Sequence, residues 1–239
     1  MDDLAIITWT NTEYSDIWPP YFGRLEKHFP NFEKSYLFVN EHSELVPERH
    51  TQLINDENDL FYKRFLKGLS EVEEDYVLYM QEDHIFYDDV DQAKIEELFK
   101  FLKESEFSFV RLIKSGELHG NEIEENIFEI PLHSPYVFSQ QSAIWKKEDL
   151  VKIFNFFRPK TYRDVESYGS IAMRNLRKSG CYYHDGGEQR GSLHFDSSIF
   201  PYVATAVCKG KWNLNQYPEE LGLALKEYDI DISIRGIYD

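Results

Sequence analysis

The amino-acid sequence predicts an α/β layered fold in a single domain. Apolar runs typical of strands alternate with segments whose apolar residues recur at helical spacing. The length of 239 residues suits one large core, and no internal repeat, low-complexity tract or linker divides it. The chain is 42% hydrophobic and rich in Phe and Tyr, a composition that excludes intrinsic disorder.

The first half of the chain shows this alternation most clearly. Apolar runs predict strands at residues 4–9, 34–40, 76–81 and 107–113, and helical patterns predict helices at residues 15–29, 58–69 and 88–105. We expect Ser15 or Asp16 to cap the first helix, with its two prolines tolerated in or before the first turn. The third helix has acidic residues in its predicted first turn, where the helix dipole favours them.

The second half of the chain predicts a mixed region. A polar stretch, a short run at residues 127–131 and a longer one at residues 134–145 favour a hairpin or edge strands. Two helices are expected at residues 146–157 and 164–180, and Gly180 is expected to cap the second of them. The predicted elements after this glycine are a polar loop at residues 184–198, a final strand at residues 202–212 and a closing helix at residues 218–228 that begins with Pro218.

The formal net charge of −17 restricts the partners of the protein. Such a surface repels phosphate backbones, so nucleic acid is excluded as a partner. A small phosphorylated substrate would need local Lys and Arg residues or a divalent cation. The sequence carries no pattern that predicts an oligomeric state.

The cysteines and the N-terminus predict a cytoplasmic protein. Cys181 and Cys208 have no spacing that indicates a zinc site or a disulfide framework, which fits a reducing compartment. The segment "MDDLAIITWT" has acidic residues where a signal peptide has basic ones, and its apolar run is too short to span a membrane. We therefore expect no integral membrane segment, and any contact with a membrane would be peripheral.

The strongest local signal lies at the end of the third predicted strand. In "DYVLYMQEDHIFYDDVD", residues 75–91, the apolar run stops at Glu82, Asp83 and His84. Ligands of open α/β sheets bind beyond the carboxyl ends of the strands. Carboxylates at such a place can hold Mg²⁺ or Mn²⁺ and leave coordination positions for substrate phosphates. The alternative is that these residues form an ordinary turn, since acids are common at strand ends.

This strand and its "QED" resemble the acidic strand-end motif of GT-A fold glycosyltransferases, which is often Asp-x-Asp. The resemblance is to the small soluble transferases found in bacterial polysaccharide loci and in large DNA viruses, which would place a viral member in the host cytoplasm. Residues 6–22, 139–154, 162–175 and 207–213 resemble further segments of that family, in the order the family requires.

The resemblance implies one GT-A-like domain over residues 1–239, an α/β/α sandwich with a mostly parallel mixed sheet. It implies transfer of a sugar from a nucleoside diphosphate donor to a glycan acceptor, with inversion and with Mn²⁺ or Mg²⁺ as cofactor. Such a cation would stabilise the charge that grows on the departing diphosphate.

The resemblance also assigns the metal and catalytic residues. Asp83 would bind the metal directly and Glu82 would contact the ribose or a metal-bound water. His84 departs from the Asp-x-Asp form, which points to an altered ligand set, and His194 could complete it together with His184 and Asp185. These histidines could equally belong to a solvated loop.

An inverting transferase needs a carboxylate base to take the proton of the acceptor hydroxyl. Glu166 is the candidate and Asp164 the alternative, because both lie where the family-like pattern places an acid. The competing interpretation is that these two residues only cap the helix or complement its dipole.

Besides Glu82, the donor-binding candidates come from three parts of the chain. They are Thr8, Trp9 and Thr10 at the end of the first strand, Arg111 in the fourth, and Lys209 and Lys211 in "CKGKW". Trp9 could stack on a nucleobase, and the lysines could meet the diphosphate, as could Arg190. Sugar faces could stack on Tyr136, Tyr168, Trp145 or Trp212. Aromatic residues in strands and helices are more often core, and lone basic residues are more often solvated.

Three rival functions remain. A sugar nucleotidyltransferase should show a Gly-rich phosphate loop after the first strand, and "TWTNTEYSD" has no glycine there. A non-catalytic protein that binds nucleotide sugars or glycans could use the same fold, and it would differ in whether Glu166 faces the pocket opened by Asp83. A metal-dependent hydrolase ranks last because no His and Asp cluster for two metals is present.

Overall fold

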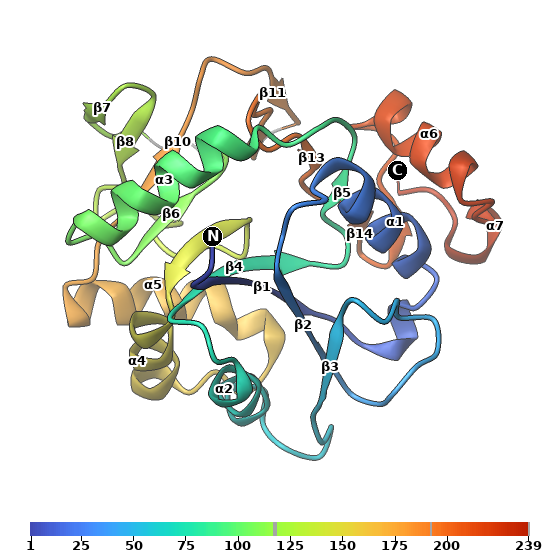
Figure 1. Ribbon diagram of the computed structural model, residues 1–239, viewed down its shortest axis with the longest axis horizontal. Coiled ribbons are helices and arrows are strands. Elements are labelled where there is room, and N and C mark those ends of the chain that lie inside the picture. The colour runs from blue at the N-terminus through green and yellow to red at the C-terminus, as the bar shows by residue number, and fades with distance from the viewer. Residues whose placement is uncertain (117–118, 192, 239) are drawn as a thin grey trace.

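The computed structural model describes residues 1–116, 119–191 and 193–238, and its centre is a mixed nine-stranded sheet (Figure 1). The strand order is β3-β2-β1-β4-β9-β6-β10-β8-β7. The bounds of these strands in chain order are β1 Leu4–Trp9, β2 Lys34–Val39, β3 Thr51–Ile54, β4 Tyr76–Gln81, β6 Phe109–Arg111, β7 Glu122–Glu124, β8 Ile127–Glu129, β9 Ala143–Lys146 and β10 Gly180–Tyr183.

Helices and short strands complete the described chain. The helices are α1 Trp18–His28, α2 Phe61–Glu71, α3 Gln92–Glu104, α4 Lys147–Phe157, α5 Val165–Leu176, α6 Pro218–Glu227 and α7 Ile232–Arg235, with 3-10 turns η1 Thr12–Tyr14 and η2 Tyr162–Asp164. The short strands are β5 Ile85–Phe86, β11 Gln189–Arg190, β12 His194–Phe195, β13 Tyr202–Val203, β14 Val207–Cys208 and β15 Lys211–Trp212. In the described ranges no helix is long and apolar enough to cross a bilayer.

The pairing of the strands confirms a mostly parallel mixed sheet. Strands β3, β2, β1 and β4 are parallel neighbours, and Trp9 pairs with Gln81, so β1 and β4 end at the same edge. Strand β9 lies antiparallel between β4 and β6, and β6 and β10 are again parallel. The expectation that residues 134–145 form an edge was wrong for β9, because this strand fills the centre of the sheet. The edge hairpin is instead β7–β8.

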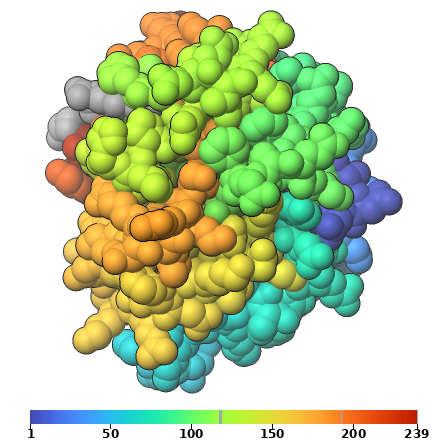
Figure 2. All heavy atoms as spheres, turned by 90° about the vertical axis from the view of Figure 1, so that its left-hand side faces the viewer, coloured from blue at the N-terminus to red at the C-terminus, as the bar shows by residue number. Residues whose placement is uncertain are grey.

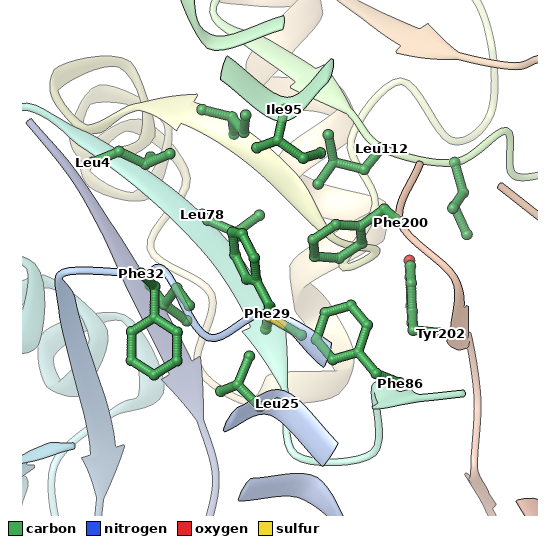
Figure 3. Close-up of a cluster of buried hydrophobic side chains, with 14 of the residues drawn as sticks. Leu4, Leu25, Phe29, Phe32, Leu78, Phe86, Ile95, Leu112, Phe200 and Tyr202 are labelled. Atoms are coloured by element: carbon green, nitrogen blue, oxygen red, sulfur yellow. The ribbon is translucent and has the colours of Figure 1, made fainter. Parts of the chain in front are cut away.

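Helices cover both faces of the sheet. Ile6 of β1 packs in the cluster that contains α1 and α3, and Ile7 packs in the cluster that contains α2, α4 and α5. Figure 1 shows these two groups of helices on opposite sides, and Figure 3 shows part of the first cluster, with Phe29 beside Phe86 and Phe200. The predicted α/β/α sandwich is thus confirmed, and strands buried on both faces explain the continuous apolar runs.

The helix ends correct three expectations. Helix α1 begins after Ile17, which makes no side-chain cap, while Asp16 pairs with Arg235. The two prolines do lie in the first turn, as expected. Helix α3 has no acid in its first turn, because Asp91 serves as its N-cap and accepts the Lys94 N–H. Helix α5 ends at Arg177 in the left-handed conformation, so Gly180 is not its cap and instead opens β10.

The C-terminal segment is less regular than expected. Residues 202–212 form three two-residue strands, β13, β14 and β15, rather than one strand. The chain turns between them, where Asn213 donates its backbone N–H to the Ala206 carbonyl and its side-chain amide to the Thr205 carbonyl. Strand β3 and helix α7 were not predicted.

The hairpin β7–β8, in yellow-green, lies beside α3 on the side of the molecule that Figure 2 shows.

The packing of α2 on the sheet gives a first prediction. A Cβ atom at Gly68 would lie 2.6 Å from the buried ring of Phe38, whereas a Cβ atom at Gly222 of α6 would meet nothing within 4 Å. We expect Gly68→Ala to lower the free energy of unfolding by about 1–3 kcal/mol through overpacking. Gly222→Ala should raise it by up to about 1 kcal/mol, because alanine favours a helix. Urea unfolding of both variants checks this, and equal effects would contradict the described packing.

Candidate active site

A cleft of about 610 Å³ opens over the edge where β1 and β4 end. It is lined by Trp9, Thr10, Asn11, Tyr14, Glu57, Asp59, Phe61, Arg64, Gln81, Glu82, Asp83, Lys160, Thr161, Tyr162, Arg163, Val207, Lys209 and Gly210. These residues come from five separate stretches of the chain. The sheet therefore places the predicted acidic motif in the largest of the cavities described here, at the edge where ligands of α/β sheets bind.

Glu82 and Asp83 are adjacent carboxyl groups on the turn that follows β4. The backbone N–H of Val207 donates to Asp83 Oδ2 at 3.4 Å, and the N–H of Ala206 donates to the Asp83 carbonyl at 3.3 Å. Both side chains are partly accessible from the cleft, although protein atoms surround them closely. This burial raises the pKa of both carboxyls, and the charge of Asp83 further raises the pKa of Glu82.

The two carboxyls fit a divalent cation. A cation beside them would favour their ionised forms and relieve the repulsion that raises their pKa values. Within the described ranges no group of three His, Cys, Asp or Glu residues is arranged to hold a metal. A cation at Asp83 would therefore complete its coordination with water and substrate oxygens, as Mg²⁺ commonly does.

Four basic residues line the same cleft. They are Arg64, Lys160, Arg163 and Lys209. Only Lys209 was predicted, and its partner in the prediction, Lys211, is exposed on β15 and does not line the cleft. The guanidinium of Arg64 donates to Asn55 at 2.5 Å and lies 5.0 Å from the Trp9 ring. These cations provide the local positive charge that an acidic protein needs to bind phosphates.

Of the three residues predicted at the end of β1, two reach the cleft and one does not. Trp9 and Thr10 line the cleft. The ring of Trp9 packs edge-on against Phe61 at 4.6 Å, which fixes its orientation. Thr8 is buried beneath them and shares a 2.6 Å hydrogen bond with the Tyr21 hydroxyl, so it does not reach the cleft.

His84 lies in the core rather than in the cleft. Its side chain is 1% exposed, and its Nδ1 lies 2.9 Å from the Ser142 hydroxyl. Burial lowers its pKa to about 3. The expectation that His84 continues the metal-binding motif is corrected by this placement, since its ring packs on Tyr202 below the cleft.

A second cavity of about 210 Å³ contains other predicted residues. It is lined by Ser115, Gly116, Tyr136, Ser139, Gln141, Glu166, Leu193, His194 and Thr205. His194 is thus separated from Asp83, and burial lowers its pKa to about 4. Arg111 lies behind the cavity, where burial lowers its pKa to about 10, and it donates to the Ser115 hydroxyl at 2.7 Å. Neither residue lines the first cleft.

The two candidate bases differ sharply. Glu166 lines the second cavity and accepts the backbone N–H of Gln140 at 2.9 Å. Asp164 instead accepts from the backbone N–H and hydroxyl of Thr161, which is the capping interaction named above as its alternative role. Glu166 therefore faces a cavity beside the Asp83 cleft rather than the cleft itself.

The two cavities adjoin. Gln81 lines the first, and its amide donates to the Gln140 carbonyl at 3.3 Å, while the Gln140 N–H meets Glu166. Burial raises the pKa of Tyr79, and the charges of Glu82, Glu166 and Asp83 all add to this increase. The carboxyls of both cavities therefore surround one tyrosine, with residues 139–141 as the wall between them.

The other candidates lie elsewhere. Arg190 is held between Asp196 and Glu220, and Asp185 accepts from Ser198. The indoles of Trp145 and Trp212 are fully buried. The remaining placements are His184 against Phe195 and Tyr168 against Phe157. None of these residues lines either of the two cavities.

No known protein-family model matches this chain, and no curated protein sequence matches it. Solved structures do. A cytidylyltransferase from Leptospira borgpetersenii is 11% identical, with a TM-score of 0.52 over 99% of both chains. A UDP-glucose pyrophosphorylase complexed with UDP-glucose is 10% identical, with a TM-score of 0.51 over 75% of this chain and 89% of that one.

A structure of S. aureus TarS 1–349 also matches, at 12% identity and a TM-score of 0.49, over 98% of this chain and 68% of that one. Identities this low show the fold alone. The chain has a GT-A-like fold. The cytidylyltransferase and the pyrophosphorylase share this architecture with the chain, which agrees with the fold that the acidic strand-end motif predicted.

The raised pKa of Asp83 gives a second prediction. Its carboxyl binds a proton more tightly in the folded than in the unfolded chain. Ionisation of this group therefore lowers the free energy of unfolding as the pH rises above the ordinary pKa of an aspartate. Asp83→Asn should therefore stabilise the metal-free protein by about 1–2 kcal/mol more at about pH 8 than at about pH 5. Asp2→Asn, whose side chain is fully exposed, serves as control. A pH-independent effect of Asp83→Asn in thermal unfolding would contradict the assignment.

Proposed function

We propose that the protein is a glycosyltransferase that binds a nucleoside diphosphate sugar in the larger cleft and a glycan acceptor in the second cavity. One observation carries this proposal. Four acidic side chains, Glu82 and Asp83 among them, and four basic side chains line one cavity, and a single carboxylate, Glu166, lines the cavity that adjoins it. A donor with a diphosphate needs the first set, and an acceptor hydroxyl needs the second.

The lining of the cleft favours one orientation of the donor. Trp9 and Thr10 line the cleft at the end of β1, where the indole of Trp9 would contact the nucleoside, while the Thr10 hydroxyl accepts from Trp18 Nε1 at 3.0 Å. Arg64, Lys209 and the basic residues at 160 and 163 offer positive charge to the diphosphate. Asp83, with Glu82, would hold Mn²⁺ or Mg²⁺. When bound, that cation would neutralise charge on the leaving diphosphate.

Glu166 is proposed as the general base. Its carboxylate would accept the proton of the attacking acceptor hydroxyl, while the hydrogen bond from the Gln140 N–H holds it in place. The acceptor and the diphosphate would then lie in different cavities, on either side of residues 139–141, with the transferred sugar between them. The acceptor oxygen would attack the anomeric carbon on the face opposite the departing diphosphate, which inverts the configuration of that carbon.

A sugar nucleotidyltransferase is the second candidate, because that class shares the fold. Such an enzyme binds a nucleoside triphosphate, for which a Gly-rich loop after the first strand would bring backbone N–H groups close to the phosphates. In this chain the corresponding residues are occupied by the turn η1, which Asn11 caps through its side chain, and no glycine is present. We therefore favour the glycosyltransferase. A protein that binds nucleotide sugars without catalysis is the third candidate. Glu166 lies outside the cleft that Asp83 lines, which is the placement expected of such a protein, so the proposal of an enzyme depends on the adjoining cavity.

A thermal-shift screen tests the donor site. UDP, GDP, CDP and dTDP, each with and without Mn²⁺, are added to the wild type, Asp83→Ala and the control Asp2→Ala. Binding at one hundred times the dissociation constant adds about 2.7 kcal/mol to the stability of the native state. We expect a Mn²⁺-dependent shift with one base, lost only in Asp83→Ala. An absence of any shift with every nucleotide would contradict the proposed function.

A further inference from the structure

The second cavity has an unusual balance of charge. Glu166 is the only charged residue that lines it among the residues the structure describes. The other polar groups there are the hydroxyls of Ser115, Ser139 and Thr205 and the side chains of Gln141 and His194. A carboxylate without a lining cation repels phosphate and carboxylate groups. An occupant of this cavity must therefore be recognised by neutral hydrogen bonds.

Arg111 reduces the negative charge of the cavity only in part. Its guanidinium is fully buried behind the cavity and is not part of the lining. It donates to the Ser115 hydroxyl at 2.7 Å and to the Tyr136 carbonyl at 3.0 Å. Arg111 therefore positions two residues of the cavity and partly offsets the charge of Glu166 from below.

The hydrogen bonds of Gln141 determine which nitrogen of His194 carries the proton. Tyr202 donates its hydroxyl to Gln141 Oε1 at 2.9 Å, and Gln141 Nε2 donates to the Ala204 carbonyl at 3.3 Å. The amide nitrogen thus faces His194 Nε2, at 2.9 Å, and the imidazole must accept there. Its proton lies on Nδ1, which is buried without a partner among the described residues, in a side chain that is 8% exposed.

A buried donor without a partner costs free energy unless a ligand supplies an acceptor. His194 lines the cavity, but protein atoms enclose its Nδ1, so an oxygen of a bound molecule satisfies this N–H only if the His194 side chain shifts. At the same cavity the ring of Tyr136 is 41% exposed, although it belongs to a large apolar side chain. Exposed aromatic faces beside neutral donors are suited to the apolar face of a sugar ring.

We propose that the second cavity binds an uncharged sugar residue, with an unsubstituted hydroxyl toward Glu166, and excludes phosphorylated and acidic sugars. This inference rests on the proposed function and names the acceptor class for it. His194 donates to an oxygen of the sugar, Tyr136 packs on its face, and Glu166 accepts from the hydroxyl that attacks.

Saturation-transfer NMR tests the binding directly, without turnover. The probes are methyl hexosides, the corresponding hexose 6-phosphates and a hexuronic acid, each added to wild type, His194→Ala, Tyr136→Ala and Tyr168→Ala. Tyr168 is the matched control, because it is 42% exposed but packs on Phe157 outside both cavities. We expect a neutral hexoside to bind the wild type and the control alike. Loss of the His194 hydrogen bond should weaken it about 5- to 100-fold.

Tighter binding of the phosphorylated or acidic sugars than of every hexoside would overturn the proposal, and so would hexoside binding that neither cavity variant weakens. Absence of binding by all probes would also overturn it. The outcome is independent of the nucleotide screen. If hexosides bind as expected but no nucleotide does, the donor site fails while the sugar site stands.

Discussion

The turn that follows β4 holds two adjacent carboxyls, Glu82 and Asp83, although burial and mutual repulsion oppose their ionisation. Both cavities depend on this turn. Parallel pairing of β4 with β1 brings this turn to the edge where both strands end. The backbone of residues 206 and 207 donates to Asp83 and thereby anchors the irregular segment that follows β13. That segment contributes Val207 and Lys209 to the first cavity and Thr205 to the second. A single turn thus organises the wall of both.

The raised pKa values of Glu82 and Asp83 mean that the ionised pair lowers the stability of the fold, which indicates a role in function. Raised pKa values of neighbouring groups in a cleft are typical of sites that bind cations or move protons. The basic residues around them come from α2, from η2 and the loop before it, and from the turn after β14, so positive charge surrounds the acids only in the folded chain. An acidic protein can bind a phosphorylated ligand in this way without a basic surface.

The elements with strong apolar patterns could be predicted from the sequence. Their pairing with strands distant in the sequence could not. Strands β1, β2 and β4 were predicted because they are buried along almost their whole length, whereas β3 has a single buried residue and gives no such signal. The central place of β9 depends on pairing with strands distant in sequence.

The same distinction explains the site. Glu82 and Asp83 were predicted from a strand end, a local signal. Their neighbour His84 points into the core instead, and its burial could not be read from its position next to them. Arg64 and the basic residues at 160 and 163 reach the cleft from remote segments, and their arrangement became visible only in the fold.

Glu166 in one cavity is proposed to activate an acceptor for a donor bound in the other, and the variant Glu166→Gln separates this role from donor binding. Release of nucleoside diphosphate is followed for the wild type and Glu166→Gln, with donor affinity measured on the same samples. We expect unchanged donor affinity and transfer slower by about 10²- to 10⁴-fold, the contribution of a general base. Transfer at the wild-type rate, or loss of donor binding, would contradict it.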